Sequence, residues 1–291
     1  MSRALADALD RLLAGQGSAA ATSLTPAQRR ELDTFARQTG AVRRVAQGRG
    51  VIYQVSDTAL AQAHLAALRP VARAQLDPLL PARANHIARM RNSKGGSHGH
   101  GTGYLLLKAA GPDVTWQRSD GERLDISDAT RSAGVAGLAF TPADDWHSAQ
   151  PVWLVENQAL FDRLDWLPAG TRGSIVYYGG QLSNLLLDWL AQRSRTDRIM
   201  FFPDYDGVGL LNYCRLVEKA QSECAFWLMP GWEDLLRKYG SNDIWQNTCK
   251  EFHAAYARLE QRGMAPELDA LCQALSLHGL ALEHEAVWLQ A

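Results

Sequence analysis

Three carboxylates stand directly after two apolar stretches of the sequence, in positions suited to holding a hard cation. Glu156 follows the run Val152–Val155, and the pair Asp204 and Asp206 follows the run Arg198–Phe202. Residues two apart in an extended segment point to the same side, so the aspartates can share one cation. An Asp-x-Asp pair by itself is common in turns, where Asp caps helices. The upstream glutamate favours a divalent-metal site over that alternative.

The apolar stretches around these carboxylates have the pattern of a parallel sheet. Four continuous apolar runs alternate with helical segments: Val152–Val155, Ser174–Tyr178, Arg198–Phe202 and Cys224–Met229. Strands that are apolar along their whole length are buried on both faces, as in a parallel sheet flanked by helices. The carboxyl ends of such strands meet at one edge. We therefore predict an α/β domain over residues 151–291, with the three carboxylates in a shared crevice.

The N-terminal part of the chain has the pattern of a winged helix, an α+β module. Residues 1–21 are predicted to form a helix followed by a Gly/Ser/Ala linker. A helix then begins at Thr25, with the proline at the first helical position, and ends at Gly40. The β-prone runs 41–46 and 51–55 form a hairpin, and a further helix follows. We expect this domain to span residues 22–110 and a β-rich connection to span residues 111–150.

Basic residues are concentrated in the N-terminal part, which indicates a phosphate-binding surface. Residues 1–110 contain 15 Lys and Arg against 6 Asp and Glu, whereas the remainder contains 15 against 25. The residues that we expect to contact double-stranded DNA are Arg29, Arg30, Arg43, Arg44, Arg49, Arg91 and Lys94. Such contacts to phosphates grip DNA without reading its sequence. Winged helices also dock proteins, so that alternative remains open.

Composition places the chain among globular proteins and gives no sign of a membrane segment. Hydrophobic residues make up 46% of the sequence and charged residues 21%. No apolar run approaches the ~20 residues that a membrane span needs, and the N-terminus lacks the pattern of a secretory signal. The four cysteines form no CxxC pair, so neither a zinc site nor a disulfide framework is indicated. We expect a cytoplasmic protein.

Three motifs together resemble the Toprim signature, in which a Glu follows the first strand and a DxD follows the third. They are LVEN at residues 154–157, YYGG at 177–180 and FPDYDGVG at 202–209. The order of a winged helix before Toprim is similar to the topoisomerase VI A subunit. It is most similar to the Toprim nuclease subunit of Wadjet-type anti-plasmid systems, JetD or MksG. The acidic LEHEAV at residues 282–287 also resembles the ending of those subunits.

The resemblance implies a Mg²⁺-dependent DNA endonuclease, in which Mn²⁺ can substitute for Mg²⁺. Its catalytic residues would be Glu156, Asp204 and Asp206, and its partners an SMC-like ATPase, a kleisin and accessory subunits. A bound metal polarises the phosphate and lowers the pKa of water, with Glu156 as a further ligand or as the general base. One such centre cuts one strand, so we expect a homodimer. We also expect Glu285 to approach the two aspartates and help to hold a second ion.

Two other functions remain as alternatives. A topoisomerase VI-like or primase-like Toprim enzyme is the nearer one, but Tyr53 and Tyr104 lack the Arg-rich, Tyr-Tyr context of a DNA-cleaving tyrosine, and a zinc module is missing. The other is a winged-helix DNA-binding regulator without catalytic activity. In that case the turn at residues 207–209 would cradle an anion at a helix N-terminus.

Overall fold

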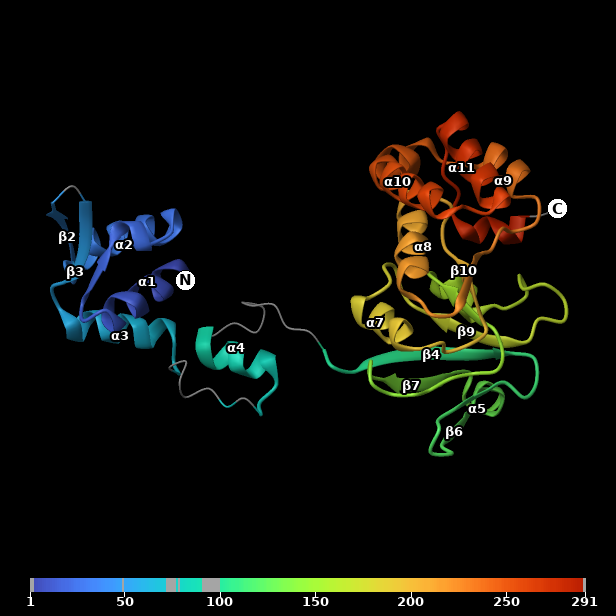
Figure 1. Ribbon diagram of the computed structural model, residues 1–291, viewed down its shortest axis with the longest axis horizontal. Coiled ribbons are helices and arrows are strands. Elements are labelled where there is room, and N and C mark those ends of the chain that lie inside the picture. Colours follow the sequence, from blue (N-terminus) through green and yellow to red (C-terminus); the bar gives the residue numbers. More distant parts are fainter. Residues whose placement is uncertain (1–2, 49, 72–76, 78, 91–99, 290–291) are drawn as a thin grey trace. The chain divides into compact units, whose positions relative to one another are not determined.

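A computed structural model of the chain describes residues 3–48, 50–71, 77, 79–90 and 100–289. The chain divides into two compact units, Met1–Gly99 and His100–Ala291 (Figure 1). Each unit has a hydrophobic core of its own. In the described part of the chain, no helix combines the length and the apolar character needed to cross a membrane.

The first unit packs helices against a three-stranded antiparallel sheet. Its helices are α1 (Arg3–Ala14), α2 (Pro26–Thr39), α3 (Thr58–Leu68) and α4 (Ala82–Met90), with a 3₁₀ turn at Ala21–Ser23. Its strands are β1 (Ser18–Ala20), β2 (Val42–Gln47) and β3 (Gly50–Val55), in the order β1-β3-β2. The predicted helix starting after Thr25 is confirmed, because Thr25 and Gln28 form a capping box. It ends at Gly40 in the left-handed conformation, as predicted.

The expected N-terminal helix is present as α1, but residues 3–21 belong to the first unit instead of lying outside the basic domain. Leu9 and Leu12 of α1 are fully buried in the core of the first unit. Within the predicted linker, Ser18–Ala20 forms β1 and pairs with β3, placing Ala19 opposite Tyr53. A Ser-Ala-Ala stretch has little β propensity of its own, so the pairing with β3 decides its conformation.

The second unit is an α/β domain with a six-stranded mixed sheet, which confirms the predicted fold class at that level. The strands are β4 (Gly103–Ala110), β7 (Ala136–Phe140), β8 (Val152–Val155), β9 (Gly173–Tyr177), β10 (Arg198–Phe202) and β11 (Glu223–Phe226). Their order is β11-β10-β8-β9-β4-β7. The first four in that order are parallel, and β8 is buried at every residue, as its continuous apolar sequence predicts.

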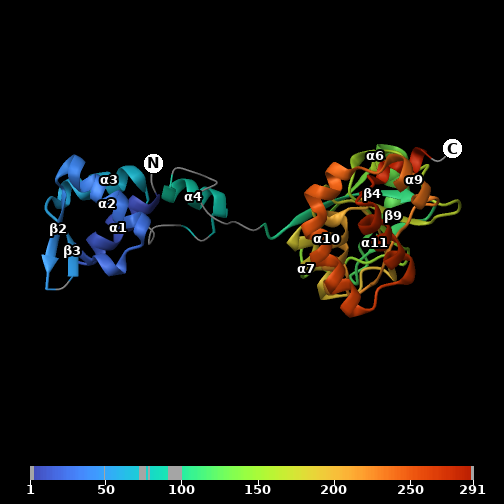
Figure 2. The same ribbon diagram turned by 90° about the horizontal axis from the view of Figure 1, so that it is seen from above.

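Helices pack around this sheet and gather at one end of it. They are α5 (Ile126–Ala133), α6 (Gln158–Asp162), α7 (Asn184–Gln192), α8 (Gly207–Lys219), α9 (Trp232–Tyr239), α10 (Asn242–Arg262) and α11 (Pro266–His278). The helix α10 packs along α8, and α5 packs on β4. Both views show α9 close to the C-terminal segment, which contains the 3₁₀ helix His284–Leu289 (Figures 1 and 2).

The expected boundary at residue 110 and the separate connection at 111–150 differ from the structure. The strand β4 lies between β9 and β7, so residues 103–110 and 136–140 belong to the same sheet as the carboxylates. The short strands β5 (Thr115–Gln117) and β6 (Arg123–Asp125) form an antiparallel hairpin, in line with the expected β-rich character of this region. Trp116 of that hairpin is buried and donates a hydrogen bond to Ser174 of β9 (2.9 Å). The second unit therefore begins near residue 100, because these segments bury their apolar side chains against its core.

Candidate metal centre

Two adjacent strands bring the predicted carboxylates to the same edge of the sheet. The parallel strands β8 and β10 pair directly, and Val155 lies opposite Phe202 at their carboxyl ends. Glu156 is the next residue after β8, and Pro203 and Asp204 follow β10. The pairing of β8 with β10 therefore places these carboxylates close together.

Asp206 is fixed by the helix that it begins. It is the N-cap of α8, and its Oδ1 accepts a hydrogen bond from the Gly209 amide at 2.7 Å. Glycine is required here, since a Cβ on Gly209 would lie 2.1 Å from the Asp204 carbonyl oxygen. A Cβ on Gly207 would lie 1.9 Å from the Thr248 carbonyl oxygen on α10. These close approaches hold the loop between β10 and α8 in one conformation.

The C-terminal segment adds two further side chains to this loop. Tyr205 and Leu282 exchange backbone hydrogen bonds of 2.8 and 3.1 Å, as in an antiparallel bridge. This pairing places His284 so that its backbone amide donates to Asp204 Oδ1 at 2.9 Å. Glu285 also lies close to Asp204 at this edge, as expected.

Asp204, His284 and Glu285 form a group with the composition of a metal site. Each offers one ligand atom, and these atoms all lie within 4.8 Å of one another. The imidazole of His284 is completely buried, with Nδ1 2.8 Å from Asp204 Oδ1 and Nε2 3.8 Å from Glu285 Oε2. Nε2 has no hydrogen-bond partner, which is unusual for a buried polar atom. Oxygen and imidazole donors of this kind suit a divalent cation.

Glu156 lies beside this group and has an unusual protonation equilibrium. Burial and the nearby negative charge of Asp204 raise its pKa to about 7. Its Oε2 accepts a hydrogen bond from the Tyr178 hydroxyl at 3.1 Å, which favours the charged form and offsets part of that shift. Tyr178 is itself stacked on Phe201 of β10, so its hydroxyl is well positioned.

The remaining pKa shifts indicate a surplus of negative charge that a cation would relieve. Burial and the charge of Asp204 raise the pKa of Asp206 to about 6, although the amide of Gly209 lowers it in part. Burial alone would raise the pKa of Asp204, but interactions with His284 outweigh it and lower the pKa. Burial lowers the pKa of His284, but Asp204 and Glu285 raise it above its ordinary value. One imidazolium would compensate part of the charge of several buried carboxylates.

Sequence reasoning missed three of the residues that shape this centre. His284 was part of the LEHEAV segment but was not recognised as a candidate ligand. Asn157 caps α6 through the Ala159 amide (2.7 Å) and donates a hydrogen bond to Glu285 Oε1. Tyr178 holds Glu156. The signal that could have found His284 was an imidazole between two glutamates in an otherwise apolar C-terminal segment.

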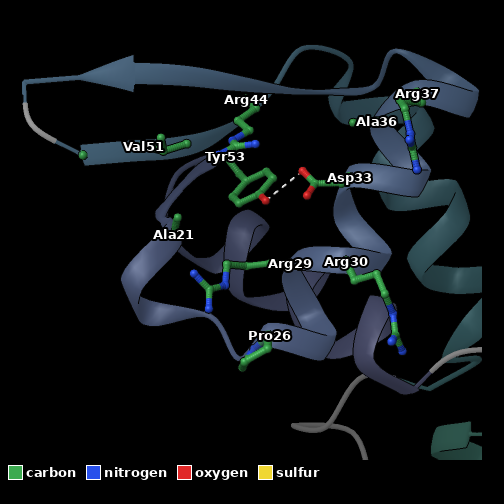
Figure 3. Close-up of a pocket in the computed structure, with 11 residues that line it drawn as sticks. Ala21, Pro26, Arg29, Arg30, Asp33, Ala36, Arg37, Arg44, Val51 and Tyr53 are labelled. Atoms are coloured by element: carbon green, nitrogen blue, oxygen red, sulfur yellow. Dashed lines mark hydrogen bonds between the residues drawn. The ribbon is translucent and has the colours of Figure 1, made fainter.

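The arginines expected to contact DNA lie on more than one surface of the first unit. Arg29, Arg30, Arg37 and Arg44 line an open cavity of about 930 Å³ between α2 and the sheet (Figure 3). In the same cavity, the Tyr53 hydroxyl donates to Asp33 at 2.8 Å.

The other expected contacts do not join this cavity in the described structure. Arg43 is exposed but does not line it, because successive residues of a strand face opposite sides and Arg44 faces the cavity. Arg49, Arg91 and Lys94 lie outside the described residues. The described basic surface is therefore formed by α2 and one residue of β2.

Neither the models of protein families nor the curated proteins contain a match.

Proposed function

We propose that the protein is a metal-dependent endonuclease that hydrolyses phosphodiester bonds of DNA. The observation that carries this proposal is the group of Asp204, His284 and Glu285 beside Glu156, at the carboxyl ends of two adjacent parallel strands. Ligand and metal sites in α/β sheets commonly occupy such edges. When bound, a divalent cation would polarise the scissile phosphate and lower the pKa of a water molecule.

The residues around the centre act as metal ligands, as a general base or as positioning residues. Asp204 and Glu285 provide oxygen ligands, and Asn157 orients Glu285 through its side-chain amide. Glu156 takes the proton of the attacking water, since it lies beside the ligand group and its carboxylate is held by the Tyr178 hydroxyl. Asp206 adds negative charge beside the ligands while it anchors the loop as the N-cap of α8.

The resemblance to Toprim nucleases and winged helices supports a role for each unit of the chain. The second unit would be the Toprim domain and the first a winged helix that grips DNA phosphates through α2 and β2. The chain would act as the nuclease subunit of an SMC-like plasmid-defence complex, with ATPase, kleisin and accessory subunits. Because one centre cuts one strand, two copies would be needed for a double-strand break.

Two observations disfavour the alternative functions. A topoisomerase needs a reactive phenol, but burial and the hydrogen bond to Asp33 raise the pKa of Tyr53, which lowers its nucleophilicity. A ligand-sensing regulator would bind an anion at the N-terminus of α8. There the amides of Gly207 and Gly209 already donate to Thr248 and Asp206, so these two donors are occupied.

The test is cleavage of supercoiled plasmid by the full-length chain with Mg²⁺ or Mn²⁺. We expect Glu156→Gln to reduce the cleavage rate at least about 100-fold, the usual loss for a general base, while the circular dichroism spectrum is unchanged. Glu260→Gln on α10 is the matched control, because Glu260 is exposed. Activity in the Glu156→Gln variant equal to that of the control would contradict the assignment of the general base. Absence of cleavage in the wild type with its partner proteins present would contradict the proposed function.

A further inference from the structure

The buried imidazole of His284 has a ring nitrogen, Nε2, for which the protein supplies no hydrogen-bond partner. Its side chain is completely buried, and although Nδ1 lies 2.8 Å from Asp204 Oδ1, Nε2 has no hydrogen-bond partner. Leaving buried polar atoms without partners costs free energy, so most such atoms in proteins have a partner. An ion pair with the carboxylates satisfies the ring only in part. Nε2 lies 3.8 Å from Glu285 Oε2, which is too far for a hydrogen bond.

The same spacing fits a cation shared by the imidazole and the carboxylate. Two ligand atoms that each lie about 2.1 Å from one ion are roughly 3 to 4 Å apart. The separation of 3.8 Å between Nε2 and Glu285 Oε2 falls within this range. Nδ1 faces Asp204 instead, at 2.8 Å, so Asp204 can orient the ring while Nε2 faces Glu285. A carboxylate that orients a ligating histidine in this way is common at metal sites.

We propose that His284 is a nitrogen ligand of the metal centre and that it shifts the preference of the site from Mg²⁺ to Mn²⁺ or a related first-row transition cation. This inference rests on the metal centre of the proposed function. Mg²⁺ binds oxygen ligands, and imidazole is a ligand of softer divalent cations. A centre with one buried imidazole between two carboxylates therefore discriminates between the two ions, which a centre of carboxylates alone does less well.

The expected consequence for affinity is measurable without any cleavage assay. The full-length wild-type chain should bind Mn²⁺ at least about tenfold more tightly than Mg²⁺, as measured by competition against the electron paramagnetic resonance signal of free Mn²⁺. His284→Gln should weaken Mn²⁺ binding at least about tenfold and change Mg²⁺ binding much less. The matched control is His278→Gln at the end of α11, an exposed histidine, which should bind both ions as the wild type does.

A spectroscopic measurement on the unmutated chain tests the ligand directly. Electron spin-echo modulation of Mn²⁺ bound to the wild type should show coupling to an imidazole nitrogen, and labelling all histidines with ¹⁵N should change that coupling. His284→Gln should abolish it, and His278→Gln should retain it. Bound Mn²⁺ without nitrogen coupling in the wild type would overturn the proposal, even if His284→Gln failed to fold.

The two proposals can fail separately. If the wild type cleaves plasmid but its bound Mn²⁺ shows no coupled nitrogen, the proposed function stands and the ligand assignment is wrong. If nitrogen coupling is present but DNA remains intact with every cation and partner, the ligand assignment stands and the nuclease proposal is wrong. Equal affinities of the wild type for Mn²⁺ and Mg²⁺ would overturn the preference that we infer.

Discussion

Glu156 has a pKa of about 7, well above the ordinary value of a carboxyl. It is partly buried, it faces the charge of Asp204, and its partner Tyr178 supplies one hydrogen bond. Burial and the charge of Asp204 hold a proton on Glu156 near neutral pH when no cation is bound, and the hydrogen bond from Tyr178 offsets part of this effect. A cation would favour the charged form, because an opposite charge nearby lowers the pKa of a carboxyl. The residue thus links metal binding to proton release.

This link predicts how the stability of the metal-free protein depends on pH. A carboxyl whose pKa is raised on folding binds more protons in the folded state, so the free energy of unfolding falls as pH rises. For Glu156 this loss begins above 4.5 and is complete only above about 7. Asp206 acts in the same direction, from 3.8 to about 6. His284 adds to the loss, since its raised pKa stabilises the fold only at lower pH.

We therefore expect the chain in EDTA to be less stable at pH 8 than at pH 5.5. Glu156→Gln should narrow the difference by on the order of 1 kcal/mol after allowance for solvent screening, or a few degrees in melting temperature. Thermal denaturation followed by circular dichroism measures this, with Glu260→Gln as the control. If the wild type were equally stable at both pH values, burial would not raise the pKa of the carboxyls of the centre.

At the scale of elements, the loop between β10 and α8 depends on close backbone contacts. Gly209→Ala should displace the Asp204 backbone, because the added Cβ would lie 2.1 Å from its carbonyl oxygen. We expect a loss of about 1–3 kcal/mol in stability, as for overpacking in a core, together with weaker Mn²⁺ binding. Gly263→Ala is not a suitable control, since its positive φ adds strain of its own.

Gly137→Ala is the better control for that experiment. Gly137 lies in the edge strand β7, and an added Cβ meets no atom within 4 Å. Calorimetric unfolding and Mn²⁺ titration are measured for both variants. The comparison distinguishes the effect of the close contact at Gly209 from the general effect of replacing a glycine with alanine. If Gly209→Ala bound Mn²⁺ as tightly as Gly137→Ala, the close approach would not position Asp204.

The elements that sequence patterns predicted well are those with a strong local signal. The capping box at Thr25 and the continuous apolar strands β8 and β10 are examples, since composition and spacing decide them. The strand β1 was missed because it depends on pairing with β3, a partner more than 30 residues away. His284 was missed for the same reason, because the bridge between Tyr205 and Leu282 joins segments distant in sequence.

At the scale of the whole molecule, the chain separates two kinds of charge. The arginines of α2 and β2 line a cavity in the first unit, whereas buried carboxylates surround the candidate centre in the second. The two hydrophobic cores share no residue. We therefore expect substitutions in the cavity to change DNA binding and substitutions at the centre to change metal binding.

The two arginines of β2 offer a test of which surface of the first unit contacts DNA. Arg44 lines the cavity and Arg43, its exposed neighbour on the same strand, does not. Both substitutions to Gln remove one charge, so a difference between them reports position and not net charge. We expect Arg44→Gln to weaken binding of the full-length chain to duplex DNA and Arg43→Gln to change it less.

The salt dependence of DNA binding tests whether Arg44 contacts a phosphate. Each lost phosphate contact lowers the slope of log affinity against log salt concentration by about one unit. Arg44→Gln should therefore reduce the slope by that amount on unrelated DNA sequences, as measured by fluorescence anisotropy in EDTA. Glu156→Gln should leave the slope unchanged, because in EDTA the centre in the second unit has no cation through which it could contact the duplex backbone. Equal slopes for Arg44→Gln and the wild type would assign the cavity to another partner, such as a protein of the complex.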